Sequence, residues 1–279
     1  MTLSCCANIY ELPLAQILLG EHFHPGGAAS TRALASACLI NRRSLVLDIA
    51  AASGNSAQLL AQEYGARVIA QDISFLNLQK GQSRQVGSQN QRVHHLNGDA
   101  HTLPLADNSV DVVLCECALC TFDDGSKALA EAFRVLKPGG FIGLSDLFLN
   151  RPLPTSLNNE LSRWLCIRDA HPWHKIEPLL ADTGFVAIRM QDKSSDLLNM
   201  VTGIVKKAEA LILPGAPFAD QKTNKQPLNE SSPEQLFPDQ LFPDRKELLQ
   251  TLSGAKDYIL SQGAGYFMLN ARKPLATNI

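Results

Sequence analysis

The sequence predicts an α/β fold with a doubly wound, mostly parallel sheet. Short apolar runs begin near residues 45, 67, 92, 110 and 141, and helical patterns of apolar residues lie between most of them. The runs follow one another at roughly 20 to 30 residues, which is the length of one βα unit. Buried strands that alternate with helices are typical of a parallel sheet covered on both faces.

The elements of the core follow from this alternation in chain order. Apolar residues at helical spacing between residues 10 and 40 predict two helices, which the Pro-Gly-Gly turn within 23–27 separates. Strands are expected at 45–49, 67–70, 92–96, 110–114 and 141–145, with helices at 56–64, 76–82 and 127–136. Because each strand is a short apolar run, both of its faces are expected to be buried.

The pattern loosens after residue 150. Helices are expected within 155–182, at 196–213 and at 245–260, and strands at 185–190 and 266–270. Residues 214–244 are rich in Pro, Gln, Asn and Asp and contain a tandem repeat of Gln-Leu-Phe-Pro-Asp at 235–244. A duplication this short cannot form a solenoid, so the segment is expected to be a mobile surface insertion without a function of its own.

Composition excludes several classes of protein. The 279 residues carry Lys+Arg 25 against Asp+Glu 27, so no basic excess favours nucleic-acid binding, and the expected partner is a small molecule. No stretch of about 18 apolar residues predicts a membrane span, and the N-terminus lacks the basic and apolar regions of a secretory signal. Seven cysteines, an odd number, favour free thiols and a cytoplasmic location. None of these features indicates an oligomeric state.

Two features at strand ends favour a nucleoside-bearing cofactor. The loop after the first strand, within residues 48–56, is rich in small residues that let the backbone approach a ligand, and it leads into a helix N-terminus. Asp72 ends the second strand about 20 residues further on, where a carboxylate can accept both hydroxyl groups of a ribose. The alternatives are an ordinary tight turn for the loop and a helix cap for Asp72.

Two longer blocks identify the cofactor by resemblance. Residues 93–113, which read VHHLNGDAHTLPLADNSVDVV, and residues 131–140, which read EAFRVLKPGG, resemble class I S-adenosylmethionine-dependent methyltransferases. The similarity is particularly to the small-molecule group that includes the ubiquinone and menaquinone methyltransferases. The resemblance covers roughly 45–148 and returns at 184–190 and 265–274. It implies a Rossmann-like sheet with an antiparallel last strand, and S-adenosylmethionine as cofactor with S-adenosylhomocysteine as product.

The resemblance also implies a cofactor site, residue by residue. Its expected members are Asp48, Ala50, Ala52, Gly54, Asp72, Ile73, Asp99, Ala100 and Cys115. Asp48 and the backbone of the first loop would face the methionine part of the cofactor, and Asp72 the ribose. Asp99 and the Ala100 backbone would recognise the adenine edge, and Cys115 would lie beside the sulfonium. One departure is that Ala50 and Ala52 stand where the family usually has glycine, which crowds a backbone meant to approach a ligand.

Three cysteines within six residues, Cys115, Cys117 and Cys120, form a second departure. In an extended chain Cys115 and Cys117 share one face, and thiolates prefer soft centres such as trivalent arsenic. The cluster resembles the cysteines with which arsenite methyltransferases hold the metalloid. Cys117 and Cys120 are therefore candidate catalytic residues. The alternative is that the thiols pack as small buried apolar groups. No resident metal ion is expected.

His24 is the third catalytic candidate, and its position also bears on the domain organisation. It lies before the core, where related enzymes place substrate-covering helices, and it could act as a base or position the acceptor; the alternative is a rigid turn. The chain is expected to form a single domain. Its parts are a helical cover at 1–43, the cofactor-binding core at 44–150, a lid at 151–182, and 183–279, which completes the core around a helical insertion and the loop 214–244.

These observations predict an enzyme that transfers a methyl group in line from the sulfonium of S-adenosylmethionine to a small molecule. The transfer needs no metal, because the methyl group is already electrophilic and the protein mainly orients the acceptor and excludes water. Two alternatives stay open. One is a thiol-assisted methyltransferase for arsenite or another soft metalloid through the three cysteines. The other is a non-catalytic cofactor- or metal-binding protein, which Ala50 and Ala52 motivate.

Overall fold

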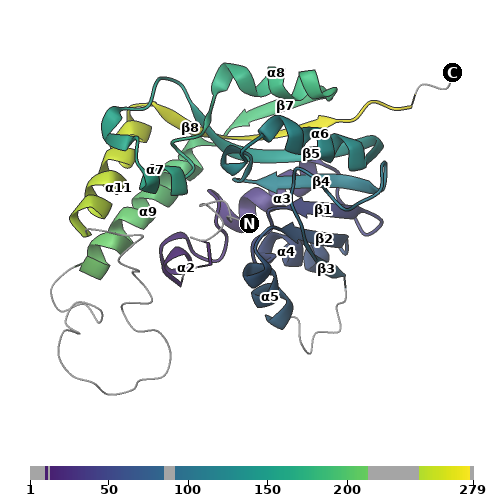
Figure 1. Ribbon diagram of the computed structural model, residues 1–279, viewed down its shortest axis with the longest axis horizontal. Helices are drawn as coiled ribbons and strands as arrows, with labels where there is room; N and C mark the ends of the chain where they lie inside the picture. Colours follow the sequence, from purple (N-terminus) through teal and green to yellow (C-terminus); the bar gives the residue numbers. More distant parts are fainter. Residues whose placement is uncertain (1–9, 12, 85–91, 213–244, 277–279) are drawn as a thin grey trace.

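A computed structural model describes residues 10–11, 13–84, 92–212 and 245–276 (Figure 1). The strands of this part of the chain form one eight-stranded sheet with the order β3-β2-β1-β4-β5-β8-β7, and β6 pairs with β5 beside this path. The strands are β1 Leu45–Ile49, β2 Arg67–Asp72, β3 Val93–Asn97, β4 Val110–Glu116, β5 Leu136–Leu149, β6 His171–Pro172, β7 Val186–Asp192 and β8 Ala264–Arg272.

The direction of the strands confirms the predicted fold class. β1 pairs in parallel with β2 and β4, β2 with β3, and β4 with β5, whereas β8 runs antiparallel to both β5 and β7. One difference concerns β5, which begins at Leu136 rather than at 141. Leu136 already pairs with Val110 across a register shift, so the strand starts directly after the preceding helix. The strand order reverses between β1 and β4, where open α/β sheets bind their ligands.

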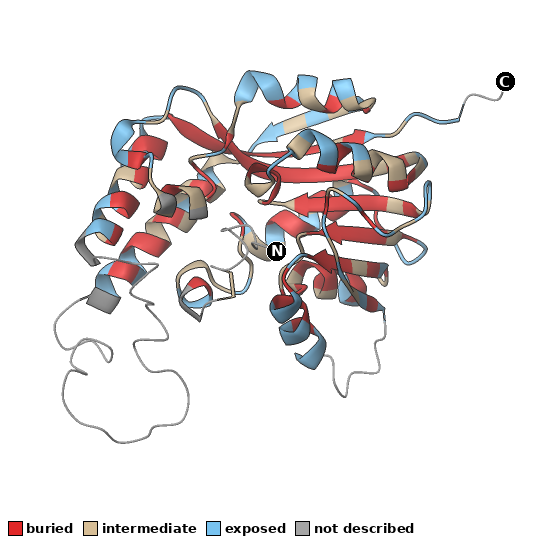
Figure 2. Ribbon diagram, viewed as in Figure 1, coloured by how far each residue is buried: buried red, intermediate tan, exposed pale blue. Residues whose placement is uncertain are grey.

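Helices cover both faces of the sheet, and the strands between them are mostly buried (Figure 2). They are α2 Pro13–Leu19, α3 Gly27–Ala37, α4 Asn55–Glu63, α5 Phe75–Arg84, α6 Gly125–Val135, α7 Glu160–Trp164, α8 Trp173–Thr183, α9 Ser194–Ile212 and α11 Arg245–Leu260. α3 and α4 contribute to the apolar core on one face, and α6 and α8 to the core on the other. The sheet is therefore the middle layer of three.

The alternation of side chains along a strand decides which polar groups meet at the ligand edge. In β4, Val113 and Cys115 pack into the core that contains α6, whereas Val112 and Leu114 pack into the core that contains α3 and α4. Successive side chains of a strand point to opposite faces. The last residue of β4, Glu116, therefore lies on the side of α3.

The insertion after β7 forms a third core of its own. α9 and α11 lie between β7 and β8 in the chain and pack against each other, and their apolar residues join those of β8 and of the segment 153–170. The predicted mobile loop 214–244 lies outside the described residues. Within the predicted lid 151–182, β6 pairs with β5 and α8 packs on α6 and β7. The division of the chain into cover, core and lid stays a prediction.

Candidate active site

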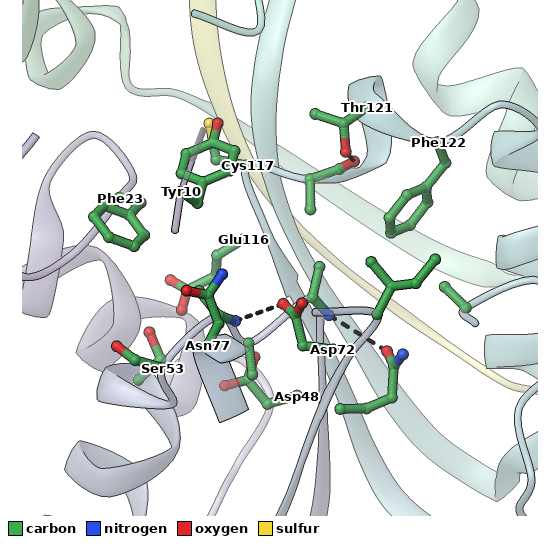
Figure 3. A pocket seen from close by; sticks show the side chains of 18 of the residues that line it. Tyr10, Phe23, Asp48, Ser53, Asp72, Asn77, Glu116, Cys117, Thr121 and Phe122 are labelled. Atoms are coloured by element: carbon green, nitrogen blue, oxygen red, sulfur yellow. Dashed lines mark hydrogen bonds between the residues drawn. The ribbon is translucent and has the colours of Figure 1, made fainter. Parts of the chain in front are cut away.

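A cavity of about 750 Å³ lies at the carboxyl ends of β1, β2, β3 and β4. Its walls come from the cover segment 21–24 with Tyr10, from the loop after β1, and from the three stretches that follow the other strands. Figure 3 shows Asp48, Asp72 and Glu116 gathered around the cavity, with Tyr10 near Cys117 and Phe122 at another side. Ligand pockets usually have volumes of roughly 300 to 1,000 Å³, so a nucleoside-sized cofactor fits.

The loop after β1 keeps a glycine-like backbone although it carries alanines. Ala50, Ala52 and Gly54 have φ values of 56°, 48° and 75°, which lie in the left-handed region that favours glycine. The loop is tied to β2, because the Ala51 N–H donates to the Gln71 carbonyl oxygen at 2.9 Å. The alanines thus preserve the shape that the resemblance associates with glycine, at the cost of backbone strain.

Replacing Ala52 by glycine should stabilise the protein. Ala52→Gly removes the left-handed strain of a Cβ-bearing residue, and we expect the free energy of unfolding to rise by about 0.5 to 1 kcal/mol. Ala130, exposed in the interior of α6, gives the matched control. Ala130→Gly should lower the free energy of unfolding by about 1 kcal/mol. Urea denaturation measures both, and a loss of stability in Ala52→Gly would contradict the strain argument.

Asp72 joins the loop to the start of the next helix. Its Oδ2 accepts the Ala52 N–H at 2.8 Å and its Oδ1 accepts the Ser74 N–H at 2.7 Å. The cap of α5 is instead Ser74, whose Oγ accepts the Asn77 N–H at 3.1 Å. Burial raises the pKa of Asp72, although the two backbone donors lower it in part. Each carboxylate oxygen keeps a further acceptor position, so Asp72 can still accept the hydroxyl groups of a ribose.

Asp48 contributes an acceptor that the protein itself leaves unused. The carboxylate is buried, and its Oδ2 has no hydrogen-bond partner among the described residues. Burial, together with the nearby Glu116 and Asp72, raises its pKa well above the usual value, whereas the Ala57 N–H acts in the opposite direction. A buried polar atom without a partner is costly. A cationic donor such as the ammonium group of S-adenosylmethionine would satisfy this oxygen, so the residues present fit the cofactor.

The predicted adenine end of the cavity is more open. Asp99 accepts from both the backbone and the ring of His101, at 2.9 Å and 2.6 Å, and its side chain is 47% exposed. The other ring nitrogen of His101 accepts the Asp124 N–H at 3.3 Å, so the proton lies on the nitrogen that faces Asp99. Ala100 and Ile73 also line this end, and Ile73 is 42% exposed. An apolar, partly open wall with one carboxylate suits a flat purine.

The structure separates the three neighbouring cysteines. Cys115 lies inside β4 and packs into the α6 core, whereas Cys117 follows the strand with φ 55° and packs against the core of α9 and α11. The prediction that Cys115 and Cys117 share one face is therefore wrong, because the extended chain ends at Glu116. Of the three cysteines, Cys117 alone lines the cavity.

Cys120 is not among the residues that line the cavity, and a buried carboxylate holds its backbone. Its backbone N–H donates to Asp146 Oδ2 at 2.9 Å, which fixes the short 3-10 turn Leu119–Thr121. Asp146 is buried in β5, and this burial raises its pKa to about 7. Like Cys115, Cys120 remains a prediction as a site residue.

A fourth cysteine that the sequence did not single out joins this group. Cys166, in the segment after α7, has Cys117, Cys120 and Tyr10 as side-chain hydrogen-bond partners, with the Tyr10 hydroxyl at 3.6 Å. These partners lower the pKa of Cys166, while burial and the same contacts raise the pKa values of Cys117 and Cys120. Nothing in the local sequence of Cys166 signals this contact, since 49 residues separate it from Cys117.

A second group that sequence analysis missed surrounds Glu116. Its carboxylate accepts from the Thr31 hydroxyl of α3 and lies 3.6 Å from His24 Nε2. His24 is buried and lines the cavity, and its role as a base or acceptor-positioning residue stays a prediction. The sequence signal that could have identified Glu116 was its position at the end of the fourth strand. No group of three or more His, Cys, Asp or Glu side chains that could hold a metal ion occurs in the described part of the chain.

Comparison with known proteins adds to this geometry. Residues 47–144 match the family described as Methyltransferase domain. An arsenite methyltransferase of Halobacterium salinarum is 26% identical over 159 residues, which are 55% of this chain and 41% of that protein. A demethylmenaquinone methyltransferase of Thermobifida fusca is 44% identical over 96 residues, which are 34% of this chain and 40% of that protein. The chain thus matches less than half the length of these relatives.

The fold extends over more of the chain than the sequence similarity does. The crystal structure of the cyclase SpnF superposes with a TM-score of 0.74 at 18% identity, covering 97% of this chain and 95% of that one. The doubly wound sheet with a cavity at its strand ends defines an α/β fold. The family match and the relatives show that residues 47–144 are a methyltransferase domain similar to those of S-adenosylmethionine-dependent methyltransferases, and S-adenosylmethionine is the cofactor of these enzymes.

Proposed function

We propose that the chain binds S-adenosylmethionine in the cavity at the ends of β1 to β4 and transfers a methyl group to a small molecule. The observation that carries this proposal is the convergence of Asp48, Asp72 and the left-handed loop on one cavity. When bound, the cofactor supplies an electrophilic methyl group, so the protein needs no covalent intermediate. The orphaned Asp48 Oδ2 and the remaining acceptor positions of Asp72 are the groups that would hold it.

The protein's own residues would orient the acceptor and exclude water. Tyr10, His22, Phe23 and His24, which lie outside the sheet, also line the cavity. His24 Nδ1 faces the Pro25 carbonyl oxygen at 3.3 Å, so this nitrogen carries a proton, and Nε2 faces the Glu116 and Thr31 side chains. The pair of His24 and Glu116 can accept a proton from an acceptor that loses one on methylation.

Methyl transfer can be tested through its product. The purified protein is incubated with S-adenosylmethionine and one acceptor at a time, a naphthoquinol, arsenite with a thiol reductant, or a secondary amine, and S-adenosylhomocysteine is quantified by mass spectrometry. We expect product with one acceptor class and about 100-fold less product in Asp72→Asn at a subsaturating cofactor concentration. Binding of the cofactor without product from any acceptor would favour the non-catalytic alternative.

A second candidate acceptor is a soft metalloid, and the contact of Cys166 with Cys117 favours it. Cys117 lines the cavity, and hydrogen bonding with Cys117, Cys120 and Tyr10 lowers the pKa of Cys166. Thiolates of this kind are ligands for trivalent arsenic. The sulfurs do not form a metal centre as they stand in the described residues, so arsenite would bind by rearranging them. The proposed arsenite ligands thus include Cys166 in place of Cys115, which the sequence analysis had grouped with Cys117 and Cys120.

Arsenite titration of single-cysteine variants tests the metalloid candidate. We expect Cys117→Ser and Cys166→Ser to weaken arsenite binding, measured by calorimetry, by about 100-fold each, because each removes a sulfur ligand. Cys38→Ala is the matched control, since burial raises the pKa of Cys38 to about 12 and the residue lies on α3's side of the sheet. Unchanged binding in both serine variants, or no binding by the wild-type protein, would reject the thiol role.

The remaining predictions about partners and location belong to the same proposal. We infer a small-molecule partner and no nucleic-acid partner from the charge balance of the chain. A cytoplasmic location stays a prediction from the cysteine count. Within the described residues, no helix combines the length and the apolar character that crossing a membrane requires.

A further inference from the structure

Glu116 is a buried carboxylate in the wall of the cavity whose position indicates a role beyond accepting a proton together with His24. It is the last residue of β4, its side chain is 4% exposed, and it lines the cavity beside Cys117. The alternation of β4 turns it toward α3 and away from the core that contains Cys115. A charged side chain this deeply buried is costly unless partners or a ligand compensate for it.

Its partners hold the carboxylate in place without fully neutralising it. The Thr31 hydroxyl lies 3.1 Å from both carboxylate oxygens, and Thr31 itself is completely buried. The Ser56 hydroxyl, at the start of α4, lies 3.2 Å from Thr31 Oγ1, and His24 Nε2 lies 3.6 Å from Glu116 Oε1. In the described part of the chain, Glu116 forms no ion pair with a lysine or an arginine. The carboxylate is therefore available to a cation bound in the cavity.

The position of Glu116 relative to the cofactor residues indicates which cation this would be. Asp48 and Glu116 interact electrostatically, and Asp48 is the residue assigned to the methionine part of the cofactor. Ser56, which belongs to the helix that follows the cofactor loop, is linked to Glu116 through Thr31. The carboxylate thus lies at the methionine end of the cavity, away from Asp99. The methionine end is also where the sulfonium of S-adenosylmethionine is carried.

We propose that Glu116 is a specificity-determining residue that makes the cavity prefer S-adenosylmethionine over S-adenosylhomocysteine; this inference rests on the proposed function. The two molecules differ by one methyl group and by the positive charge on sulfur. A carboxylate held close to that charge in a protein interior alters the relative affinity by roughly tenfold or more. Because the attraction disappears when the methyl group leaves, Glu116 favours exchange of product for fresh cofactor rather than the transfer step itself.

Calorimetric titration with the two ligands tests this selectivity. In Glu116→Gln, we expect the affinity for S-adenosylmethionine to fall about tenfold and the affinity for S-adenosylhomocysteine to change by less than about threefold. Glu116→Asp keeps the charge and should retain most of the preference. Glu177→Gln, the same change at an exposed residue of α8, is the matched control and should leave both affinities unchanged. The readout is a ratio of two binding constants, which a general loosening of the cavity would not change.

The outcomes separate this inference from the proposed function. If the wild-type protein binds neither ligand, the proposed function fails and the inference fails with it. If the wild-type protein binds both ligands and Glu116→Gln keeps the wild-type ratio, the selectivity role is overturned and the proposed function stands. Should Glu116→Gln not fold, Thr31→Val removes the hydroxyl group that holds both carboxylate oxygens. The ratio should then fall by about threefold, and an unchanged ratio overturns the inference.

Discussion

Asp72→Asn should weaken the binding of S-adenosylmethionine by about 100-fold and lower the free energy of unfolding by about 2 kcal/mol. The carboxylate accepts the backbone N–H groups of Ala52 and Ser74, one on each oxygen. An amide cannot replace it, because its NH₂ group must face one of these donors and leaves that N–H without an acceptor. The same substitution removes charge-assisted hydrogen bonds to the hydroxyl groups of the ribose.

Two measurements distinguish these effects of Asp72. Calorimetry gives the affinity for the cofactor, and urea denaturation gives the free energy of unfolding in the absence of cofactor. Asp257→Asn, an identical change at an exposed position of α11, should alter the free energy of unfolding by less than about 0.5 kcal/mol. A variant at Asp72 that binds the cofactor as tightly as the wild-type protein would remove this residue from the proposed cofactor site.

Gly81→Ala should cost about 2 kcal/mol of stability and weaken cofactor binding as well. A Cβ atom on this residue of α5 would meet the Ser53 carbonyl oxygen and lie 2.8 Å from His95 Nε2, so the helix or the cofactor loop must move. Overpacking of this kind costs roughly 1 to 3 kcal/mol, and the better helix propensity of alanine offsets only part of it. Because Ser53 belongs to the loop after β1, its displacement alters the wall of the cavity.

Gly203 provides the control for the Gly81 prediction. It lies inside α9, and no atom lies within 4 Å of the place where its Cβ would be. Gly203→Ala should therefore raise the free energy of unfolding by about 0.5 to 1 kcal/mol, through helix propensity alone. If both alanine variants gained stability, the close approach of α5 to the cofactor loop would be contradicted.

The parts of the fold that local patterns determine were predictable from the sequence. The five parallel strands of the core are short apolar runs, and each was expected at or near the residues where the structure has it. That Asp72 ends a strand at the ligand edge was expected from the strand pattern, because strand ends in an α/β sheet converge on one edge, whereas Asp48 was expected through the family resemblance; the roles of both stay predictions. The antiparallel β8 was expected only through the family resemblance, since strand direction is not encoded in a local apolar pattern.

The contacts made by segments far apart in the chain were not predictable. Cys117 and Cys166 lie near each other because the chain leaves β4 in a left-handed conformation at Cys117 and returns after α7. The periodicity of a strand cannot reveal where the strand ends. The predicted cluster therefore included Cys115, which is near Cys117 in the sequence, and left out Cys166, which is near it in the structure. Likewise, the polar group of Glu116, Thr31 and His24 needs α3 to pack beside β4, which the local sequence of each residue does not show.

The left-handed alanines connect the sequence with the proposed function. Ala50 and Ala52 raised the alternative of a non-catalytic cofactor- or metal-binding protein, because the family usually has glycine at these positions. The loop nevertheless adopts the conformation that glycine would favour, and the Ala52 N–H remains bound to Asp72. The cost of the substitution therefore falls on stability rather than on the shape of the site.

Calorimetric titration of the wild-type protein with S-adenosylmethionine tests the central claim most directly. The account predicts saturable binding at one site, with a dissociation constant between roughly 1 μM and 1 mM. The protein must first show a cooperative thermal transition, so that a negative result reflects the site and not an unfolded chain. Absence of binding at millimolar cofactor by such a folded preparation would contradict the assignment of Asp48, Asp72 and the loop after β1 as a cofactor site.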